Sequence, residues 1–356
     1  MKNKNYFNLL AIVTLLLFCT SINAKVWRVN NNDAYNNYSN SNPNDIVFEN
    51  LQTAVDYEDV EDGDTLYVEA SAINYMIVNL NKRLTLIGAG YFLEENTNLQ
   101  FNTHNSSVSR INFGENSSGS KIYGLRITGS SGVSIGFTVP VSDIIISRCY
   151  AQSSLAFNNG SGSINNLILT KNYLEAISAS GTGTLTINNF MISNNYINTI
   201  TLKSNTIATV TQNVIQSFVN IHSGTSFFNN ICLSTGNNFF TQNNNTASTI
   251  SHNIFFSTQT QLSWLNGGNN NFSNTNSIFL NNNDTTDKKY QLKSLNLCQV
   301  CYNGTPENTQ IGMYGGNDPY ILSGIPAIPT IYSLQASSSA PQGGTLQTTI
   351  STRSNN

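Results

Sequence analysis

The segment FMISNNYIN, residues 190–198, places two adjacent asparagines inside an apolar run. Asparagine is a poor strand former, and its amide is costly to bury without hydrogen-bond partners. Asn194 and Asn195 therefore belong either to a functional site or to the architecture of the fold. Most of what the sequence indicates about function depends on which of the two holds.

Related segments recur along the chain in the frame apolar, polar, polar, Asn, bulky, apolar. The Asn position of this frame falls at Asn172, Asn195, Asn213, Asn230, Asn253 and Asn276, with Cys149 and Arg126 in the same position upstream. From residue 126 onward the successive spacings are 23, 23, 23, 18, 17, 23 and 23 residues. An internal period of this size is typical of a solenoid.

The frame predicts extended rather than helical structure. Apolar residues lie three before and two after the Asn position, as Ile192 and Ile197 do around Asn195. No repeat has the i, i+3, i+4, i+7 pattern of an amphipathic helix. A coil of 17 to 23 residues holds about three short strands with their turns. The sequence therefore predicts an all-β fold, a parallel β-helix.

Stacking of identical side chains explains the asparagines. In a solenoid each repeat contacts its neighbours, and at a spacing of about 4.8 Å stacked amides can hydrogen-bond along a ladder. Asparagine also tolerates the left-handed backbone conformation of a tight corner. Asn195 is thus predicted to be part of an Asn ladder. Asn194 is expected to face solvent, in a variable polar position that elsewhere holds Arg148, Lys171, Gln212, Asn229 and His252.

Residues 1–24 are expected to be a secretory signal peptide. Lys2 and Lys4 give a basic start, Leu9 to Phe18 an apolar core, and Ala24 a small residue at the cleavage point. No later stretch approaches the ~18 apolar residues of a membrane span, so no transmembrane segment is expected in the mature chain. The predicted location is outside the cytoplasm, as a secreted, periplasmic or cell-surface protein.

The charge balance argues against a general nucleic-acid binder. The chain has 16 Lys and Arg against 19 Asp and Glu, and removing the leader takes the net charge from −3 to −5. Such binders need a basic patch that neutralises phosphates. Acids are also scarce in the repeats, where Asp143 and Glu175 are the only ones between residues 120 and 283.

Four cysteines remain after the leader. Cys149 and Cys232 lie about four coils apart, roughly 19 Å, whereas bridged cysteines need Cα atoms within ~7 Å, so both are predicted to be buried thiols. Cys298 and Cys301 form either a local disulfide or two ordinary thiols. A single Cys-x-x-Cys is a weak metal signal because zinc takes four ligands, so no metal and no cofactor are predicted.

The ends of the chain differ from the repeats. After a lead-in at 25–47, residues 48–71 predict a short amphipathic helix and then a strand, which together suit the cap that a solenoid needs. The β-helix is expected to span residues 48–318. Two alternating segments around SSSAPQGG predict a β-hairpin in the tail, residues 319–356.

Four motifs carry a family resemblance: DGDTLYV, KRLTLIGAG, the repeated N-x-[I/F] coils and the closing YQLKSLNL…TQIGMYGG. Over roughly residues 45–325 they resemble bacterial secreted right-handed parallel β-helix proteins of the pectin lyase-like superfamily, with PbH1 repeats. The resemblance implies the fold and the hand of the coil. It leaves activity open, because that superfamily contains lyases, hydrolases, esterases and adhesins.

The repeats offer little for catalysis. Glycoside hydrolases need paired carboxylates, and the lyases of the resembled superfamily use an acidic calcium cluster with a basic residue. Asp143 and Glu175 do not share a stackable register, and with His252 they are only weak catalytic candidates. No catalytic residue is therefore predicted.

The position after the ladder offers a candidate binding surface. It holds Tyr150, Tyr173 and Tyr196, and the next position is also apolar, so one of the two rows must face outward. An exposed row of stacked tyrosines would suit sugar rings. The alternative is that loops or the C-terminal hairpin cover it.

These observations favour an exported, non-catalytic protein that binds carbohydrate or acts in adhesion, with a polysaccharide or a cell-surface glycan as partner. Two alternatives stay open. One is a polysaccharide lyase or glycoside hydrolase with an atypical site, and the other is a purely structural surface protein.

Overall fold

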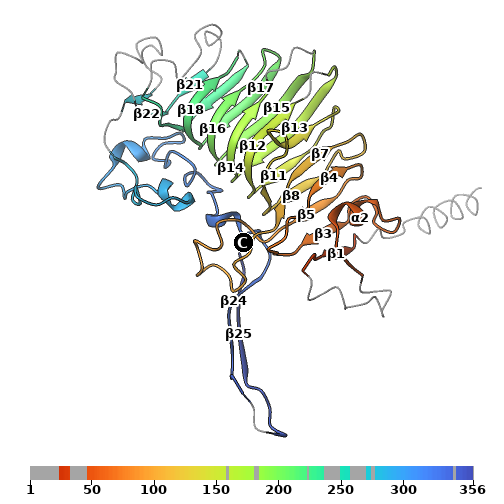
Figure 1. Cartoon of the computed structure of the whole chain (residues 1–356). Coiled ribbons are helices and arrows are strands. Elements are labelled where there is room, and N and C mark those ends of the chain that lie inside the picture. Colours follow the sequence, from red (N-terminus) through yellow and green to blue (C-terminus); the bar gives the residue numbers. More distant parts are fainter. Residues whose placement is uncertain are drawn as a thin grey trace, which may run out of the picture.

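The computed structural model describes residues 24–32, 46–157, 160–179, 184–222, 224–235, 249–256, 270–273, 277–339 and 342–355. Their strands form two long sheets in which all pairings are parallel, and one separate antiparallel hairpin. The chain passes from one sheet to the other in successive coils, which stack along a single axis (Figure 1). The predicted parallel β-helix is confirmed.

Sheet A joins eleven strands of the described chain. In spatial order they are β2 (Val47–Phe48), β1 (Val26–Val29), β3 (Thr65–Val68), β5 (Thr85–Ile87), β8 (Lys121–Tyr123), β11 (Ile145–Ser147), β13 (Ser163–Thr170), β15 (Thr186–Ser193), β17 (Thr206–Thr211), β19 (Thr225–Phe228) and β21 (Thr249–Ser251).

Sheet B joins twelve strands. Ten follow one path: β23 (Phe272–Ser273), β22 (Ile254–Phe255), β20 (Ile231–Cys232), β18 (Val214–Asn220), β16 (Tyr196–Thr201), β14 (Tyr173–Ser178), β12 (Tyr150–Phe157), β10 (Val133–Phe137), β7 (Arg110–Phe113) and β4 (Ile77–Leu80). The other two, β6 (Ser107–Val108) and β9 (Arg126–Ile127), pair with each other, and β9 also pairs with β12.

Apolar side chains fill the space between the two sheets. The column predicted three residues before the ladder is fully buried through Ile146, Leu169, Ile192 and Val210, which pair in register across β11, β13, β15 and β17. Alternation along each strand sends every second residue into this core, which is why the coils need no helix to bury it.

The coils contain fewer separate strands than predicted. Three short strands per coil were expected; the second and third stay separate in two early coils, as β6 and β7 and as β9 and β10, whereas from β12 to β18 they merge into one bent strand of sheet B. The register of β12 against β14 shifts between Ala151 and Ser154, and β16 shifts in the same way against β18 after Ile197. A bulge of this kind bends a strand without ending it.

Five predicted ladder asparagines are fully buried and bonded to one another: Asn172, Asn195, Asn213, Asn230 and Asn253. The Oδ1 of Asn195 accepts from the backbone N–H and the Nδ2 of Asn172, at 2.8 and 3.0 Å. Its own Nδ2 donates to the carbonyl of Leu169 and to Oδ1 of Asn213, both at 3.0 Å. The ladder begins at Cys149, whose backbone N–H donates to Asn172.

The ends of the ladder differ from the prediction. After Asn253 the next member is Asn271, only 18 residues on, whose Oδ1 accepts from the Asn253 backbone and side chain. Asn276 lies outside the described residues. Upstream, Arg126 pairs with Tyr150, the residue after the ladder position at Cys149. The prediction that Arg126 holds the ladder position was therefore wrong, and Leu125 holds it. That coil is one residue longer than the assumed period.

The left-handed backbone conformation also lies one residue earlier than predicted. The ladder asparagines do not adopt it. The preceding residues do, with φ of +54 to +58° at Arg148, Lys171, Asn194, Gln212, Asn229 and His252. Each corner therefore consists of one left-handed residue and one buried ladder residue between the sheet A and sheet B strands.

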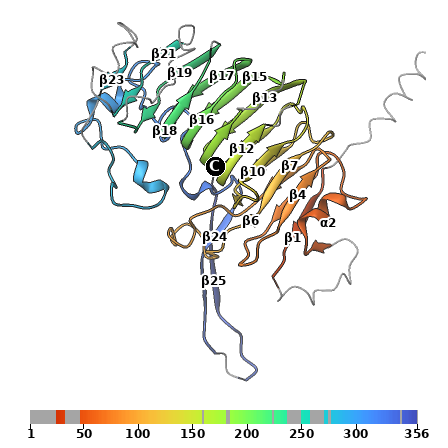
Figure 2. The ribbon, with the colours of Figure 1, turned by 45° about the horizontal axis from the view of Figure 1, so that its top comes forward.

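The two ends confirm the predicted cap and tail. Helix α2 (Leu51–Asp56) buries Leu51, Ala54 and Val55, and the Asn50 side chain caps it by accepting from the Thr53 backbone. Strands β24 (Thr330–Ala336) and β25 (Thr348–Arg353) form an antiparallel hairpin that projects away from the coils (Figures 1 and 2). Between β23 and β24 the described chain forms three short 3₁₀ turns, η4 (Asp287–Tyr290), η5 (Gln299–Tyr302) and η6 (Leu322–Gly324).

The cysteine predictions hold. Cys149 and Cys232 are separate buried thiols, and Cys298 is bonded to Cys301, with Cα atoms 5.4 Å apart. Burial raises the pKa of Cys149 to about 12, so its thiol stays protonated and unreactive at neutral pH. Within the described part of the chain, no helix is both long and apolar enough to cross a membrane.

Replacing Asn195 with Ala should destabilise the protein strongly. The change leaves the buried Asn172 N–H and the Leu169 carbonyl without the partners that Asn195 supplies. Each unsatisfied buried group costs about 1–3 kcal/mol, so the free energy of chemical unfolding should fall by roughly 3 kcal/mol or more.

Asn198 provides the matched control, because its amide lies near the surface and its side-chain partners among the described residues are Glu175 and Ser217. Asn198→Ala should cost less than about 1 kcal/mol. Equal losses for the two variants would contradict the structural role of the ladder.

Candidate functional site

The three weak catalytic candidates do not come together. Asp143 and Glu175 are both exposed, Asp143 at the turn before β11 of sheet A and Glu175 within β14 of sheet B. His252 lies at the corner before β22, four strands from β14 in sheet B, or about 19 Å along the axis. No pair among them could flank one scissile bond.

Asp143 and Glu175 instead belong to polar rows on the outside of the coils. Asn189 Nδ2 donates to Asn166, and Asn166 Nδ2 donates to Asp143, both at 2.7 Å. Asn198 Nδ2 donates to Glu175 at 2.6 Å. Both carboxylates therefore end surface rows of amides. His252 Nε2 lies 2.9 Å from Asn270 Nδ2 in a similar row.

Tyr150, Tyr173 and Tyr196 lie in one row, in which Tyr173 and Tyr196 stack and Tyr150 meets Tyr173 edge-on, but other rings cover the row. The ring centroids of Tyr173 and Tyr196 are 4.2 Å apart, and Tyr290 of η4 stacks on Tyr196 at 4.7 Å. Phe92 packs against Tyr150 at 5.0 Å. Tyr196 is only 8% exposed. Loops cover the row, which was the predicted alternative to an open stripe.

The position before the ladder is also covered, which corrects the expectation that it faces solvent. Asn194 Nδ2 donates to the carbonyls of Met313 and Gly315, at 3.1 and 2.8 Å. Asn229 exchanges two hydrogen bonds with the Thr305 backbone. The left-handed corners point these side chains outward, and the segment from 301 to 328, here called the C-terminal cover, accepts them.

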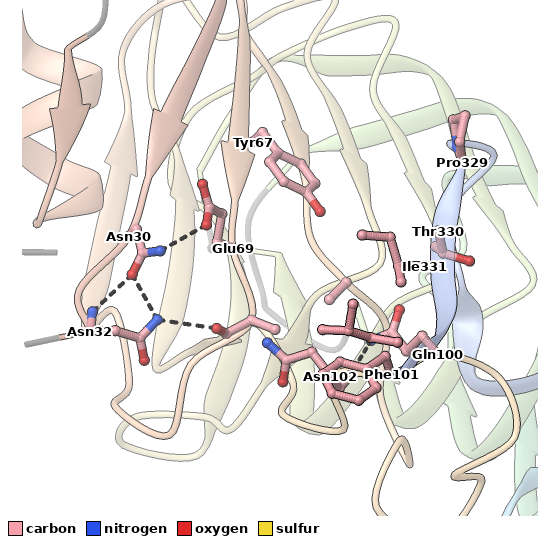
Figure 3. A pocket seen from close by; sticks show the side chains of 13 residues that line it. Asn30, Asn32, Tyr67, Glu69, Gln100, Phe101, Asn102, Pro329, Thr330 and Ile331 are labelled. Carbon is pink, nitrogen blue, oxygen red and sulfur yellow. Dashed lines mark hydrogen bonds between the residues drawn. The ribbon is translucent and has the colours of Figure 1, made fainter. Parts of the chain in front are cut away.

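A pocket of about 340 Å³ with a mixed polar and apolar lining lies at the other end of the molecule. One wall is formed by β1 and β3 with Asn30, Asn32, Tyr67 and Glu69, and the opposite wall by the base of the hairpin at 329–334. Figure 3 shows these two walls facing each other, with Gln100, Phe101 and Asn102 closing the space between them.

Hydrogen bonds hold the β1 side of the pocket rigid. Glu69 accepts from Arg28 Nε at 2.6 Å and from Asn30 Nδ2 at 2.7 Å. Asn30 Oδ1 in turn accepts from the Asn32 backbone and side chain, at 2.9 and 2.7 Å. The single carboxylate of the lining is thus already neutralised and oriented.

The hairpin wall is fastened to the loop that carries Phe101. The Phe101 backbone N–H donates to the Ile331 carbonyl at 2.8 Å, and Arg353 Nη2 donates to the Leu99 carbonyl. These contacts depend on the backbone of the loop, so the Phe101 side chain itself stays 54% exposed at the mouth of the pocket.

Several polar groups of the lining are left for a ligand. Among the described residues, nothing hydrogen-bonds to the Tyr67 hydroxyl, to Gln100 Oε1 or to Asn102 Nδ2. Burial, helped by the Glu69 charge, raises the pKa of Tyr67, so its hydroxyl stays a donor at neutral pH. Amides and a hydroxyl offer donors and acceptors together, which suits a neutral ligand rich in hydroxyl groups.

Sequence reasoning missed this pocket. The repeat drew attention to the coils, whereas the pocket uses the lead-in strand, an irregular loop and the tail. The one available signal was the amide cluster NNN at 30–32 directly after the strand-forming run VWRV at 26–29. Nothing local indicated that residue 331 would lie beside residue 101.

A second feature lies beneath the C-terminal cover, where Asp287 is fully buried. Its Oδ2 accepts from the Tyr320 hydroxyl at 2.9 Å and from the Ser323 backbone at 2.6 Å. Tyr320 also shares a hydrogen bond with Tyr91. Burial raises the pKa of Asp287 to about 6. The cluster joins the loop at 91–96 to the cover.

In the portion of the chain that the structure describes, no group of three His, Cys, Asp or Glu side chains could hold a metal ion. Comparisons of the chain with protein-family models, with curated proteins and with solved structures found no match.

The buried Asp287 carboxyl should make the stability of the protein depend on pH. Its folded-state pKa of about 6 exceeds the usual carboxyl value of 3.8, so the fold favours the protonated form. That stabilisation is fully present below about pH 4 and is lost as the pH rises through about 6, on the order of 3 kcal/mol. Asp287→Asn should flatten this part of the pH profile in chemical unfolding. Parallel profiles for the two proteins would contradict it.

Proposed function

We propose that this chain is an exported, non-catalytic carbohydrate-binding protein of the cell surface, and a divergent member of the pectin lyase-like superfamily. The observation that carries the proposal is the amide-lined pocket between β1, β3 and the hairpin base. The stacked coils and the Asn ladder support the family assignment.

The chemistry of the pocket favours neutral sugar. Tyr67, Gln100 and Asn102 offer paired donors and acceptors without net charge, because the Glu69 carboxylate is engaged by Arg28. Phe101, Ile331 and Leu334 add exposed apolar surface at the mouth, where an aromatic ring can receive the apolar face of a sugar ring. A neutral sugar presents both hydroxyl groups and apolar C–H faces. It therefore matches this lining better than an ionic or a purely apolar ligand does.

The pocket lining has too few carboxylates for hydrolysis, which favours binding without turnover. Hydrolysis of a glycosidic bond needs two carboxyl groups on opposite sides of that bond. The pocket lining has Glu69 alone, and both oxygens of Glu69 accept hydrogen bonds. The location outside the cell rests on the expected leader, residues 1–24.

The test is a glycan array with the purified protein, followed by product analysis on each glycan bound. Phe101→Ala should weaken binding of the best glycan at least tenfold, since stacking and burial are lost while the Phe101 backbone bond to Ile331 remains. Tyr67→Phe, which removes one hydroxyl, should weaken it about three- to tenfold.

The matched control is Ile207→Ala, because Ile207 is 57% exposed on β17 and lies outside the pocket. It should bind as the unmodified protein does. An array silent for every glycan would favour a structural role, and shortened sugars among the products would favour a lyase or hydrolase. Either result would overturn the proposal.

A further inference from the structure

A second cavity of about 430 Å³ lies on the outer face of sheet A, beneath the end of the C-terminal cover. Its floor consists of side chains from β5, β8, β11 and β13. Ile87, Tyr123 and Ser147 are paired in register across three of these strands, and Ile145 is paired with Ile168 beside them. Four adjacent strands make a floor about 14 Å across.

Residues 326–328 form the wall of this cavity. Pro326 packs over Gly124, where an added Cβ would lie 3.1 Å from the proline ring. Gly124 also has φ of +64°, so a glycine at this position permits both the turn and the close approach. Together with Ile328, the wall makes the cavity predominantly apolar, within the size range of small-molecule sites.

Arg148 is buried at the edge of the cavity, and the carboxylate whose charge acts on it, that of Asp318, lies beyond ion-pair distance. Arg148 is 9% exposed, and its Nη1 donates only to the carbonyls of Ile325 and Asn355, at 2.7 and 3.5 Å. No carboxylate of the described chain lies within ion-pair distance of Arg148. Asp318, the acid that lines the cavity, is paired with Lys171 instead.

A buried guanidinium in this state calls for an anion. Arginine keeps its proton in proteins, so it cannot relieve the cost of burial by becoming neutral. It has five N–H donors in a fixed fork, and the contacts above use Nη1 alone. The residues that line the cavity carry two positive charges, on Arg148 and Lys171, and one negative charge, on Asp318. One surplus positive charge therefore lies beside an apolar floor.

We propose that this cavity binds a small organic monoanion with an apolar body, a carboxylate joined to an aliphatic group. The carboxylate accepts from the Arg148 guanidinium, and the aliphatic group lies on Ile145, Ile168 and Ile328. A carboxylate fits better than a phosphate because one surplus charge faces the cavity and the guanidinium fork matches its two oxygens. This site is separate from the sugar pocket and does not rest on its function.

The experiment titrates the purified protein with octanoate, octanol and octyltrimethylammonium by isothermal calorimetry. Octanoate should bind, octanol should bind at least tenfold more weakly, and the cation should give no heat of binding. Octanol binding as tightly as octanoate, or no octanoate binding at millimolar concentration, would overturn the proposal.

Two variants probe the cavity from different sides. Arg148→Met removes the charge, and Ile168→Glu places a carboxylate on the floor without touching the contacts of Arg148 to the cover. Each should weaken octanoate binding at least tenfold. Thr209→Glu is the matched control, since Thr209 lies in the same outward row two strands away and outside the lining. Octanoate binding that Ile168→Glu leaves unchanged, in a variant whose melting temperature matches that of Thr209→Glu, would contradict the assignment.

Discussion

The side-chain amide of the ladder asparagine is the interaction on which the rest of the molecule depends. At each corner it accepts the backbone N–H of the equivalent residue in the coil before and donates to a carbonyl of that coil, as Asn195 does with Asn172 and Leu169. A buried corner would otherwise leave backbone groups unpaired. Because the ladder satisfies them, the chain can turn from sheet A to sheet B within two residues.

The same corner determines what can lie outside it. A left-handed residue precedes each ladder position and directs its side chain away from the core. In Asn194 and Asn229 that side chain bonds to the C-terminal cover, and in Arg148 it reaches both the cover and the second cavity. Core architecture and outer sites thus share one backbone constraint. Phe92 and Tyr290, from two other segments, cover the tyrosine row and turn a potential binding stripe into an interior layer.

The repeated frame of the coils determined how much of the structure could be predicted from the sequence. Asn172 to Asn253, the core columns and the separate thiols followed from spacing, because neighbouring coils repeat one environment. The prediction of Arg126 failed where the coil length changed, and after Asn253 the ladder continues at Asn271, 18 residues on, since loop length leaves no periodic trace. The pocket beside β1 and β3 was not predicted, for another reason. It joins Asn30, Phe101 and Ile331, which are far apart in the chain and belong to no repeat.

Hydrogen–deuterium exchange of the native protein tests the central role of the ladder most directly. Peptides containing the corners at Asn172, Asn195 and Asn213 should exchange slowest, because their buried N–H groups open only when neighbouring coils separate. Peptides of the hairpin, residues 330–353, should exchange fast, since it projects from the body as two strands. Corner peptides that exchange as fast as the hairpin would contradict the account.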